Sequence, residues 1–324
     1  MNTVNIVMAT YNGEKYLAEQ IESILNSTYT DWSLFLCDDG STDQTLAIAA
    51  QYEAKYPERI HIIKNERNLG VTKNFLVNLK KLKQESELIE GGFSKISSNV
   101  AKYYMFADQD DVWFPEKIEM TIARMEKMER KYGKDKPLLV FSDTTVVDEG
   151  LKQLHPSFYF VQCYNLYHMD LGHMMMENKC IGCTIMVNES LVKKLNTIPE
   201  HARYHDWWAA LIASAFGKIS FIGQPLMYYR QHSSNEVGTM TYGNYFMRRI
   251  KNLKAQREAI KATVEQAKDF YEIYGPELSD RERRRVYQFS TLYEHNWFAR
   301  RRILLRTHTL KSGLLRNLGL FLIA

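Results

Sequence analysis

The chain has 324 residues, of which 45% are hydrophobic and 25% charged, with four cysteines and a formal net charge of +4. This composition is that of an ordinary globular protein, and it excludes a disordered chain and a small disulfide scaffold. The length allows one large α/β domain with an appendage, or two modest domains. No secretory signal precedes the first predicted strand, so we expect a reducing, cytoplasmic compartment.

The first half of the chain alternates strand and helix patterns. Strands are predicted at Val4–Ala9, Trp32–Cys37, Ile60–Lys64 and 103–107, with helices at Glu14–Asn26, Ser41–Tyr52 and Thr72–Lys83. Such alternation predicts parallel strands joined by right-handed crossovers, with ligands at the carboxyl ends of the strands. Polar clusters follow four of these strands: Thr10–Asn12, Asp38–Ser41, Asn65–Gly70 and Asp108–Asp111.

The second half is less regular. A loop is predicted at residues 84–99 and a strand at 137–147, and residues 157–178 form either a packed, irregular lobe or a mobile lid. From Tyr242 the pattern indicates helices only, with a break at Gly275-Pro276 and a restart at Ser279. No apolar run there reaches the roughly 18 residues that span a bilayer.

Charge is distributed unevenly between the two ends of the chain. From Arg248 onward there are 17 Lys/Arg and 8 Asp/Glu, a balance of +9, so the first 247 residues carry −5. A basic tail on a mildly acidic body predicts an anionic partner, either nucleic acid or membrane. The stretch Trp297–Ala324 fits a basic amphipathic helix on a membrane surface, or equally a helix that covers the body or forms a dimer contact.

The most informative motif is Asp108-Gln109-Asp110-Asp111-Val112-Trp113, directly after the apolar run 103–107. Three carboxylates at the end of a buried strand repel one another and lose hydration, so they need a cation or strong hydrogen-bond donors. Mg²⁺ or Mn²⁺ carrying a substrate diphosphate would satisfy them, because hard cations share oxygen ligands with phosphates. The alternative is a solvated acidic turn before the helix that follows Pro115.

A second acidic turn, 38–43, also follows a predicted strand and opens a helix. A carboxylate there can bind a pyrimidine N–H or a ribose hydroxyl, although a turn with a helix N-cap explains the same residues. The chain has no Gly-x-Gly-x-x-Gly or Walker-type loop, so phosphates would be held through a metal. Cys180 and Cys183 have no second pair and no histidines at zinc-finger spacing. We therefore expect them to pack within a strand rather than to bind zinc.

Two later motifs carry further ionisable groups. His205-Asp206-Trp207-Trp208 fits a general base in a partly apolar pocket, or a helix N-cap followed by core aromatics. In the segment 228–235, His232 can ligate a metal and Arg230 can bind a phosphate, whereas a lone histidine is more often structural. The residues alone leave these alternatives open.

In their order along the chain, these motifs resemble those of the family 2 glycosyltransferases of the GT-A fold. The resemblance covers about residues 3–236, from Ala-Thr-Tyr-Asn-Gly to Arg-Gln-His-Ser-Ser-Asn. Asn68-Leu69-Gly70, with Lys73-Asn74-Phe75 and His-Asp-Trp-Trp, is most similar to bacterial rhamnosyltransferases of cell-wall or capsular polysaccharide synthesis. The implied fold is α/β, a Rossmann-like mixed sheet flanked by helices, with a C-terminal helical extension.

The resemblance also implies a role for each matching residue. The nucleotide-sugar site would contain Thr10, Tyr11, Glu14, Asp39, Asn68, Lys73 and Asp108. Asp110 and His232 would hold Mn²⁺ or Mg²⁺, Asp206 would be the catalytic base, and Trp207 and His205 would line the acceptor site. Many members carry Glu-Asp where this chain has His205-Asp206, but the base itself is retained.

The organisation implied is a glycosyltransferase domain at 1–241 and a basic helical region at 242–324. Residues 1–113 would form the nucleotide-binding half and 114–241 the acceptor half. The reaction expected is an inverting transfer of L-rhamnose from dTDP-rhamnose to a lipid-linked, growing saccharide. The enzyme would work on the inner face of the cytoplasmic membrane, with its basic region on anionic lipid.

Other donors and other classes of protein were considered as alternative interpretations of the sequence. UDP-glucose, UDP-galactose or an N-acetylated hexosamine donor stays open, as does a homo-oligomer. A non-catalytic sugar-nucleotide-binding protein is disfavoured because Asp108, Asp110 and Asp206 are all present. Nucleic-acid binding is disfavoured because the apolar residues of the tail cluster toward its end, and a glycoside hydrolase because the acids gather at one site.

Overall fold

The structure is a computed structural model that describes all residues except 1–2, 91–100, 196 and 233–252. The strands and helices predicted for the first half are present, with small shifts at their ends. They are β1 (Val4–Thr10), α1 (Leu17–Leu25), β2 (Trp32–Asp38), α2 (Thr45–Lys55), β3 (Ile60–Lys64), α3 (Val71–Glu90) and β4 (Tyr103–Ala107). In α1 the buried residues Leu17, Ile21 and Ile24 recur at helical spacing, which fixes the face that packs on the sheet.

Helix α3 is longer than predicted. The sequence suggested a loop from residue 84, but residues 84–90 continue the helix, because they include Glu and Leu, which favour helix, and no Gly or Pro. The rest of that predicted loop, residues 91–99, lies outside the described residues.

The described strands form one mixed sheet in the order β3-β2-β1-β4-β8-β6-β9-β5, and β7 also pairs with β6. The first four strands in this order are parallel. The later strands are β5 (Val112–Trp113), β6 (Leu138–Val147), β7 (Gln153–His155), β8 (Met186–Asn188) and β9 (Lys218–Arg230). The carboxyl ends of β1, β2 and β4 therefore lie along one edge, where their polar turns meet.

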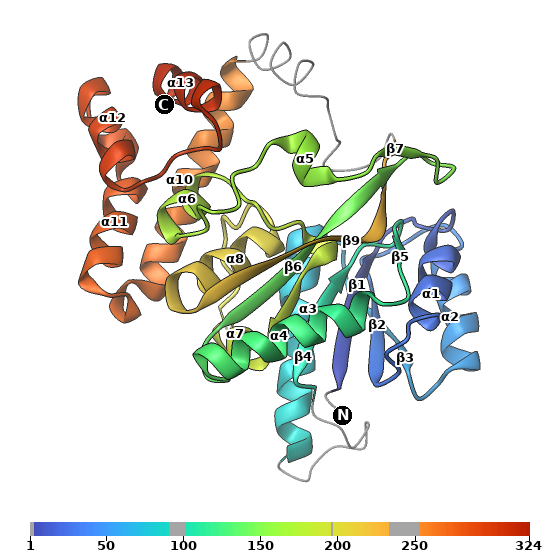
Figure 1. The fold of residues 1–324 in the computed structure, drawn as a ribbon. Coiled ribbons are helices and arrows are strands. Elements are labelled where there is room, and N and C mark those ends of the chain that lie inside the picture. The colour runs from blue at the N-terminus through green and yellow to red at the C-terminus, as the bar shows by residue number, and fades with distance from the viewer. Residues whose placement is uncertain (1–2, 91–100, 196, 233–252) are drawn as a thin grey trace.

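Helices cover both faces of this sheet (Figure 1). Strands β2 and β3 are added on one side of β1, and β4 is added on its other side. Right-handed crossovers therefore place α1 and α2 on one face of the sheet and α3 on the other. Helix α8 (His205–Phe216) contacts α3, and α4 (Lys117–Tyr132) contacts β6, β8 and β9. Trp208 of α8 is fully buried in this core.

Residues 157–178 form a packed lobe rather than an open lid. They contain the short helices α5 (Phe158–Gln162) and α6 (Leu171–Met176), and the three methionines 174–176 are all buried. After them come a 3₁₀ turn at Gly182–Thr184 and the helix α7 (Glu189–Lys194). Cys180 and Cys183 are buried as predicted, but they lie before and within the 3₁₀ turn rather than in a strand.

The C-terminal region is helical, as predicted. It contains α10 (Leu253–Tyr274), α11 (Asp280–Ser290), α12 (Trp297–Arg306) and α13 (Leu314–Ile323), with 3₁₀ turns at Gly275–Glu277 and Leu292–Glu294. The predicted restart is confirmed, because the Ser279 side chain caps α11 by accepting from the Glu282 N–H. The predicted domain boundary at 241–242 lies outside the described residues.

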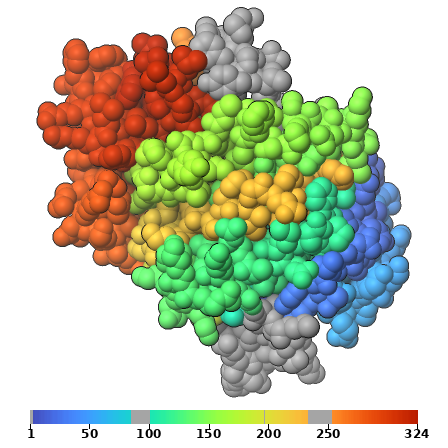
Figure 2. Space-filling model, viewed as in Figure 1, coloured from blue at the N-terminus to red at the C-terminus, as the bar shows by residue number. Residues whose placement is uncertain are grey.

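This region packs against the body of the protein, and Figure 2 shows its red helices against the yellow-green lobe of residues 157–178. Trp208 lies 5.5 Å from Phe270 of α10 between ring centroids. Buried Arg316 of α13 pairs with buried Glu177 at 3.2 Å. The tail therefore covers the body, and it is two short helices at its end rather than one long amphipathic helix. Among the described helices, none has the length and hydropathy needed to cross a membrane.

Candidate active site

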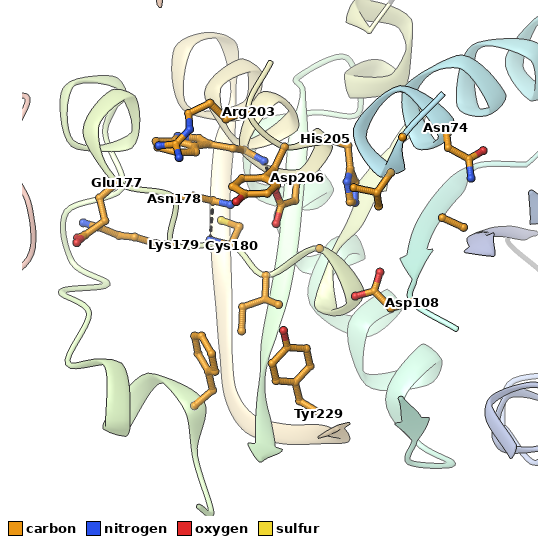
Figure 3. Close-up of a pocket in the computed structure, with 18 of the residues that line it drawn as sticks. Asn74, Asp108, Glu177, Asn178, Lys179, Cys180, Arg203, His205, Asp206 and Tyr229 are labelled. Atoms are coloured by element: carbon orange, nitrogen blue, oxygen red, sulfur yellow. Dashed lines mark hydrogen bonds between the residues drawn. The ribbon is translucent and has the colours of Figure 1, made fainter. Parts of the chain in front are cut away.

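A cavity of about 700 Å³ lies at the carboxyl ends of β1, β2 and β4 and extends to the C-terminal region. Its first end is lined by the turns after these strands, including Tyr11, Asp39, Asn68 and Asp108. Its far end is lined by residues 176–182, the start of α8, and α10. Asp206 lies between the labelled Asp108 and Arg203 (Figure 3), so it stands where the two ends meet.

Asp39 organises the first end of the cavity. Its buried carboxylate accepts hydrogen bonds from the N–H groups of Leu69 (2.9 Å) and Gly70 (2.8 Å) and from Nδ2 of Asn65 (2.8 Å). Asn68 Nδ2 donates to the Asp39 carbonyl oxygen at 2.9 Å. Asp39 thus fastens the Asn-Leu-Gly loop over the end of β2, and its contact with a base or ribose stays a prediction.

Tyr11 is half exposed and lines the same end. The Gln109 amide holds the backbone of Tyr11 from both sides, with Oε1 accepting from its N–H (2.9 Å) and Nε2 donating to its carbonyl (3.0 Å). A Cβ on Gly13 would lie 2.1 Å from Gln109 Oε1, so a larger residue there would move the Gln109 amide away from Tyr11. Gln109 reaches Tyr11 only because the ends of β1 and β4 lie side by side, and this role was not predicted from the sequence.

The other predicted nucleotide contacts divide into two groups. Thr10 is buried and lines the cavity, and its hydroxyl donates to Asp38 at 3.3 Å. Glu14 and Lys73 are not among the lining residues. Glu14 accepts from the Gln44 N–H at 2.8 Å, and Lys73 is exposed on α3. Their predicted donor contacts therefore remain predictions.

Arg230 is buried and its hydrogen bonds hold the acidic turn in place. Its side chain is 2% exposed, pairs with Glu19, and donates through Nε to the Asp110 carbonyl (2.7 Å) and through Nη1 to the Glu149 carbonyl (2.5 Å). The Arg230 N–H also donates to Asp111 Oδ1 at 3.2 Å. The structure gives Arg230 this bracing role instead of the phosphate contact that the sequence suggested.

The acidic turn is short of positive charge. Burial, Asp110 and Asp206 together raise the pKa of Asp108 to about 7. Burial and the neighbouring carboxylates raise the pKa of Asp111 well above its usual range. A buried cation lies close by: Lys117 donates to the Cys183 carbonyl at 2.6 Å, and burial lowers its pKa to about 8. Arg230, the other buried cation at this turn, is already paired with Glu19, and Lys117 does not balance three carboxylates.

This turn fits a hard divalent cation. His232 Nε2 lies 2.7 Å from Asp110 Oδ2, so folding brings together the two predicted metal ligands. One ligand atom each of Asp108, Asp111 and Cys183 lies within 4.8 Å of the others. Carboxylate oxygens that raise each other's pKa are the donors that Mg²⁺ and Mn²⁺ prefer. That Asp110 and His232 bind the metal stays a prediction.

Asp206 stands in the first turn of α8 and has the properties of a general base. Burial has the largest effect and raises its pKa to about 7, while hydrogen bonds from the N–H groups of Trp207 and Gly182 and from the Asn178 side chain act in the opposite direction. Asn178 is itself held, because its Oδ1 accepts from the Cys180 N–H at 3.0 Å (Figure 3). A carboxylate fixed in this way, with a pKa near neutral, is suited to proton abstraction.

His205 precedes this base and is buried. Its ring stacks on Phe75 with 3.8 Å between centroids and meets Phe106 edge-on at 5.0 Å. Burial lowers its pKa to about 3, so the ring is neutral. A Cβ on Gly182 would lie 2.9 Å from His205 Nε2, which leaves room only for glycine. His205 does line the cavity, and its predicted acceptor contact stays a prediction.

The far end of the cavity is rich in aromatic rings. Trp207 is held by a hydrogen bond from Nε1 to the Met174 carbonyl at 2.5 Å. Tyr164 and Tyr204 also line the cavity, whereas Tyr229 lines it beside the acidic turn, with the Phe158 ring 5.9 Å away between centroids. Such rings pack well on the apolar faces of sugars. Of these lining residues only Trp207 was predicted from the sequence; the other rings and the contribution of α10 were not.

Comparisons with known proteins find similar sequences and similar structures. The family model "Glycosyl transferase family 2" matches residues 5–132. MJ1057 of Methanocaldococcus jannaschii, an uncharacterized glycosyltransferase, is 31% identical over 236 residues, 70% of each chain. RfbG of Shigella flexneri, named a dTDP-rhamnosyl transferase, is 29% identical over 240 residues, 71% of this chain and 73% of RfbG. EpsE of Bacillus subtilis, named as a glycosyltransferase, is 37% identical over 140 residues, and the match spans 43% of this chain and 44% of EpsE.

Solved structures confirm the predicted fold. TarS 1–349 of S. aureus in complex with UDP-GlcNAc has a TM-score of 0.55 at 15% identity, over 91% of this chain and 72% of that one. The mannosyltransferase PcManGT from Pyrobaculum calidifontis, in complex with GDP-Man and Mn²⁺, has a TM-score of 0.54 at 11% identity, over 94% and 73%. At these identities the likeness concerns the architecture alone: a mixed sheet flanked by helices, with helices at the C-terminus.

Proposed function

The chain belongs to the family 2 glycosyltransferases, and on that premise we propose that it is a metal-dependent, inverting transferase with Asp206 as its base. One observation carries this proposal. Asp206, with a pKa of about 7, lines the same cavity as the acidic turn of Asp108 and Asp110. A nucleotide sugar on the acidic turn and an acceptor on the aromatic end would meet at Asp206.

In the proposed reaction the Asp206 carboxylate takes the proton from an acceptor hydroxyl while that oxygen attacks the anomeric carbon. The Trp207 N–H and Asn178 hold the carboxylate in place, and the surrounding burial keeps its pKa near that of a working base. The aromatic rings of the far end orient the acceptor and keep water away from the reacting carbon.

A divalent cation, Mn²⁺ or Mg²⁺, would neutralise the charge that develops on the departing diphosphate. Asp110 and His232 are the residues proposed to hold it, with Asp108 nearby on the cavity wall. The fit rests on the carboxylates of this turn, because the pKa of Asp108 and that of Asp111 stay raised although Lys117 and Arg230 lie beside them. The Mn²⁺ bound in PcManGT is consistent with this assignment.

The proposed donor is dTDP-rhamnose. The support is the 29% identity to RfbG over 240 residues, together with the Asn68-Leu69-Gly70 loop that Asp39 fastens beside the cavity. A UDP-hexose is the alternative donor, since the TarS structure of the same fold carries UDP-GlcNAc. The base and the sugar are therefore the first variables to test.

The proposed acceptor is a lipid-linked, growing cell-surface saccharide at the inner face of the cytoplasmic membrane. The outer face of α13 supports a peripheral position there, because Leu314, Leu315, Leu318 and Leu322 are 48–76% exposed. Helix α12, joined to α13 by a hydrogen bond from Arg301 Nε to the Phe321 carbonyl (2.8 Å), adds exposed Arg302 and Arg306. Leucines beside arginines suit an anionic lipid surface.

A thermal shift series with dTDP and UDP, each with and without Mn²⁺, tests the donor site. A ligand that binds the folded state raises its stability by about RT ln(1 + [L]/Kd). We expect a shift with dTDP that needs Mn²⁺ and that Asp110→Ala abolishes. A shift with UDP alone would move the donor to a UDP-hexose, and no shift with either nucleotide would contradict the proposal.

Sedimentation with vesicles tests the membrane assignment. We expect binding to vesicles that contain anionic lipid, and its loss when Leu314, Leu318 and Leu322 are all replaced by Ser. Vesicles of neutral phosphatidylcholine are the control, because the arginines have no anionic partner there. The membrane assignment would be refuted if the wild type sedimented equally with both vesicle types. It would also be refuted if the triple variant sedimented with anionic vesicles as much as the wild type does.

A further inference from the structure

The cavity carries opposite charges at its two ends. The first end has the carboxylates of Asp39, Asp108 and Asp110, whereas the lining residues of the far end include Lys179, Arg203 and Lys311. Glu177 also lines the far end, but it is paired with Arg316 at 3.2 Å and accepts from the Ser312 N–H at 2.8 Å. The far end is therefore cationic, which a neutral sugar by itself does not require.

Arg203 is the best-placed of these cations. Its Nη1 donates to the Ala259 carbonyl (3.2 Å) and to the Thr263 hydroxyl (3.1 Å), both on α10. The carbon at the centre of its guanidinium lies 5.2 Å from the centroid of the Trp207 ring. The group is thus fixed at one nitrogen, beside the ring that follows the catalytic base. Figure 3 shows Arg203 on the opposite side of Asp206 from Asp108.

Arg203 has no carboxylate partner in the part of the chain that the structure describes. Its side-chain bonds there all run from Nη1, so Nε and Nη2 remain for a ligand. Burial lowers the pKa of Arg203, and the nearby phenol of Tyr204 acts in the opposite direction. A partly buried cation without a counter-charge is costly, and an anion that enters the cavity would relieve that cost.

Lys311 stands on the same wall and comes from the loop between α12 and α13. Its backbone is held on both sides by Asn317, whose Oδ1 accepts from the Lys311 N–H and whose Nδ2 donates to the Lys311 carbonyl, each at 2.7 Å. The C-terminal region therefore supplies both a cation to this end and the groups that orient Arg203.

We propose that Arg203 and Lys311 form a subsite for an anionic group of the acceptor, either a phosphate or a carboxylate. The inference rests on the proposed transferase function and names the acceptor as a charged molecule. A guanidinium fork matches the geometry of both anions, and lysine adds a point charge. The group could be the diphosphate of a lipid carrier or the carboxylate of an acidic sugar. Bound there, it places the rest of the acceptor along the aromatic wall toward Asp206.

Calorimetric titration of the full chain with two probes tests this subsite. Sodium pyrophosphate represents the carrier diphosphate and methyl glucuronide the acidic sugar, both in EDTA so that no metal assists binding, and at constant ionic strength. We expect one of them to bind the wild type, and the preferred probe to identify the source of the anion. Arg203→Gln should weaken that binding about tenfold or more, and Lys311→Gln several-fold.

Two further variants serve as controls. Arg203→Lys keeps the charge and should retain part of the binding. Lys268→Gln removes one charge from the exposed side of α10 and should bind the probe as the wild type does. Melting temperatures establish that each variant is folded. If Arg203→Gln does not fold, Lys311→Gln tests the subsite independently. The subsite is refuted if neither probe binds the wild type, or if both glutamine variants bind it unchanged.

The nucleotide titration separates this inference from the proposed function. We expect Arg203→Gln to keep the Mn²⁺-dependent thermal shift with dTDP or UDP, because Arg203 lies at the other end of the cavity. A wild type that binds nucleotide but neither anion would refute the subsite and leave the transferase proposal standing. A wild type that shows no nucleotide shift would instead refute the transferase proposal.

Discussion

Replacing Asp206 by Asn removes one charge and preserves the shape of the side chain. The Asn oxygen can still accept from the Trp207 N–H, so the variant should fold. Loss of the general base should lower turnover by about 10²–10⁴-fold. Binding of nucleotide with Mn²⁺ should be retained, because Asp206 is outside the proposed donor and metal contacts and acts on Asp108 only through its charge. The assay is the initial rate of nucleoside diphosphate release, with the thermal shift measured on the same sample.

The pH profile gives this prediction its magnitude. With a pKa of about 7, roughly a tenth of the wild-type molecules carry the Asp206 carboxylate at pH 6 and roughly nine tenths at pH 8. The rate at low acceptor concentration should therefore rise about tenfold between these values. An aspartate with its ordinary pKa of 3.8 would be ionised throughout and would give no such rise. The residual activity of the Asn variant should lose the part of this rise that comes from Asp206, although Asp108 still titrates near pH 7.

The raised pKa also predicts the effect on stability. Because Asp206 binds its proton more tightly in the folded chain than in the unfolded one, the stability gained at low pH is lost as the pH rises from about 4 to about 7. The difference between the two pKa values corresponds to about 4 kcal/mol at most. Asp206→Asn should therefore melt above the wild type at pH 8, by a margin that shrinks as the pH falls. A flat wild-type rate profile, or full turnover in the variant, would refute Asp206 as the base.

Three further changes test other parts of the structure. Arg316→Met leaves Glu177 charged and buried, so the free energy of unfolding in urea should fall by about 3–5 kcal/mol. Adding Glu177→Gln to this variant should recover part of the lost stability, and a double variant with no recovery would contradict the pairing. Gly182→Ala places a Cβ 2.9 Å from His205 Nε2, so turnover should fall several-fold with the circular dichroism spectrum retained, whereas unchanged turnover would mean that the ring has room to move. Lys117→Met removes the cation beside the acidic turn, so Mn²⁺ binding followed by tryptophan fluorescence should require higher pH, and an unshifted midpoint would count against a role in charge balance.

The local parts of the site could be predicted because strand ends are visible in the sequence. A short apolar run followed by polar residues marks where a parallel strand stops, and Thr10, Asp39 and Asp108 all follow such runs. The position of Asp206 at the start of a helix could be predicted for a similar reason, since it opens the apolar run of α8. The end of α3 was misplaced, because helix propensity alone does not mark a terminus that lacks a strong stop signal.

Other roles depend on partners that are far apart in the chain. Gln109 clamps Tyr11 across 98 residues, and His232 meets Asp110 across 122. Arg203 is oriented by Thr263 from a helix beyond the matched family motifs. No local pattern distinguishes Gln109 or Arg203 from an ordinary surface residue, so their roles could not be predicted from the sequence, and His232 was paired with Asp110 only through the family resemblance.

By itself, then, the sequence determined the alternating strands and helices, the helical tail and the family motifs, because these follow from periodicity and from residue types at strand ends. Only the tertiary structure decided how the tail packs, and that packing brings Lys311 to the far end of the cavity and orients Arg203 there. It also decided that Asp206 titrates near neutral pH and that His205 stays uncharged. The reason is that desolvation is the sum of contacts from many separate segments, and that sum exists only once the chain has folded.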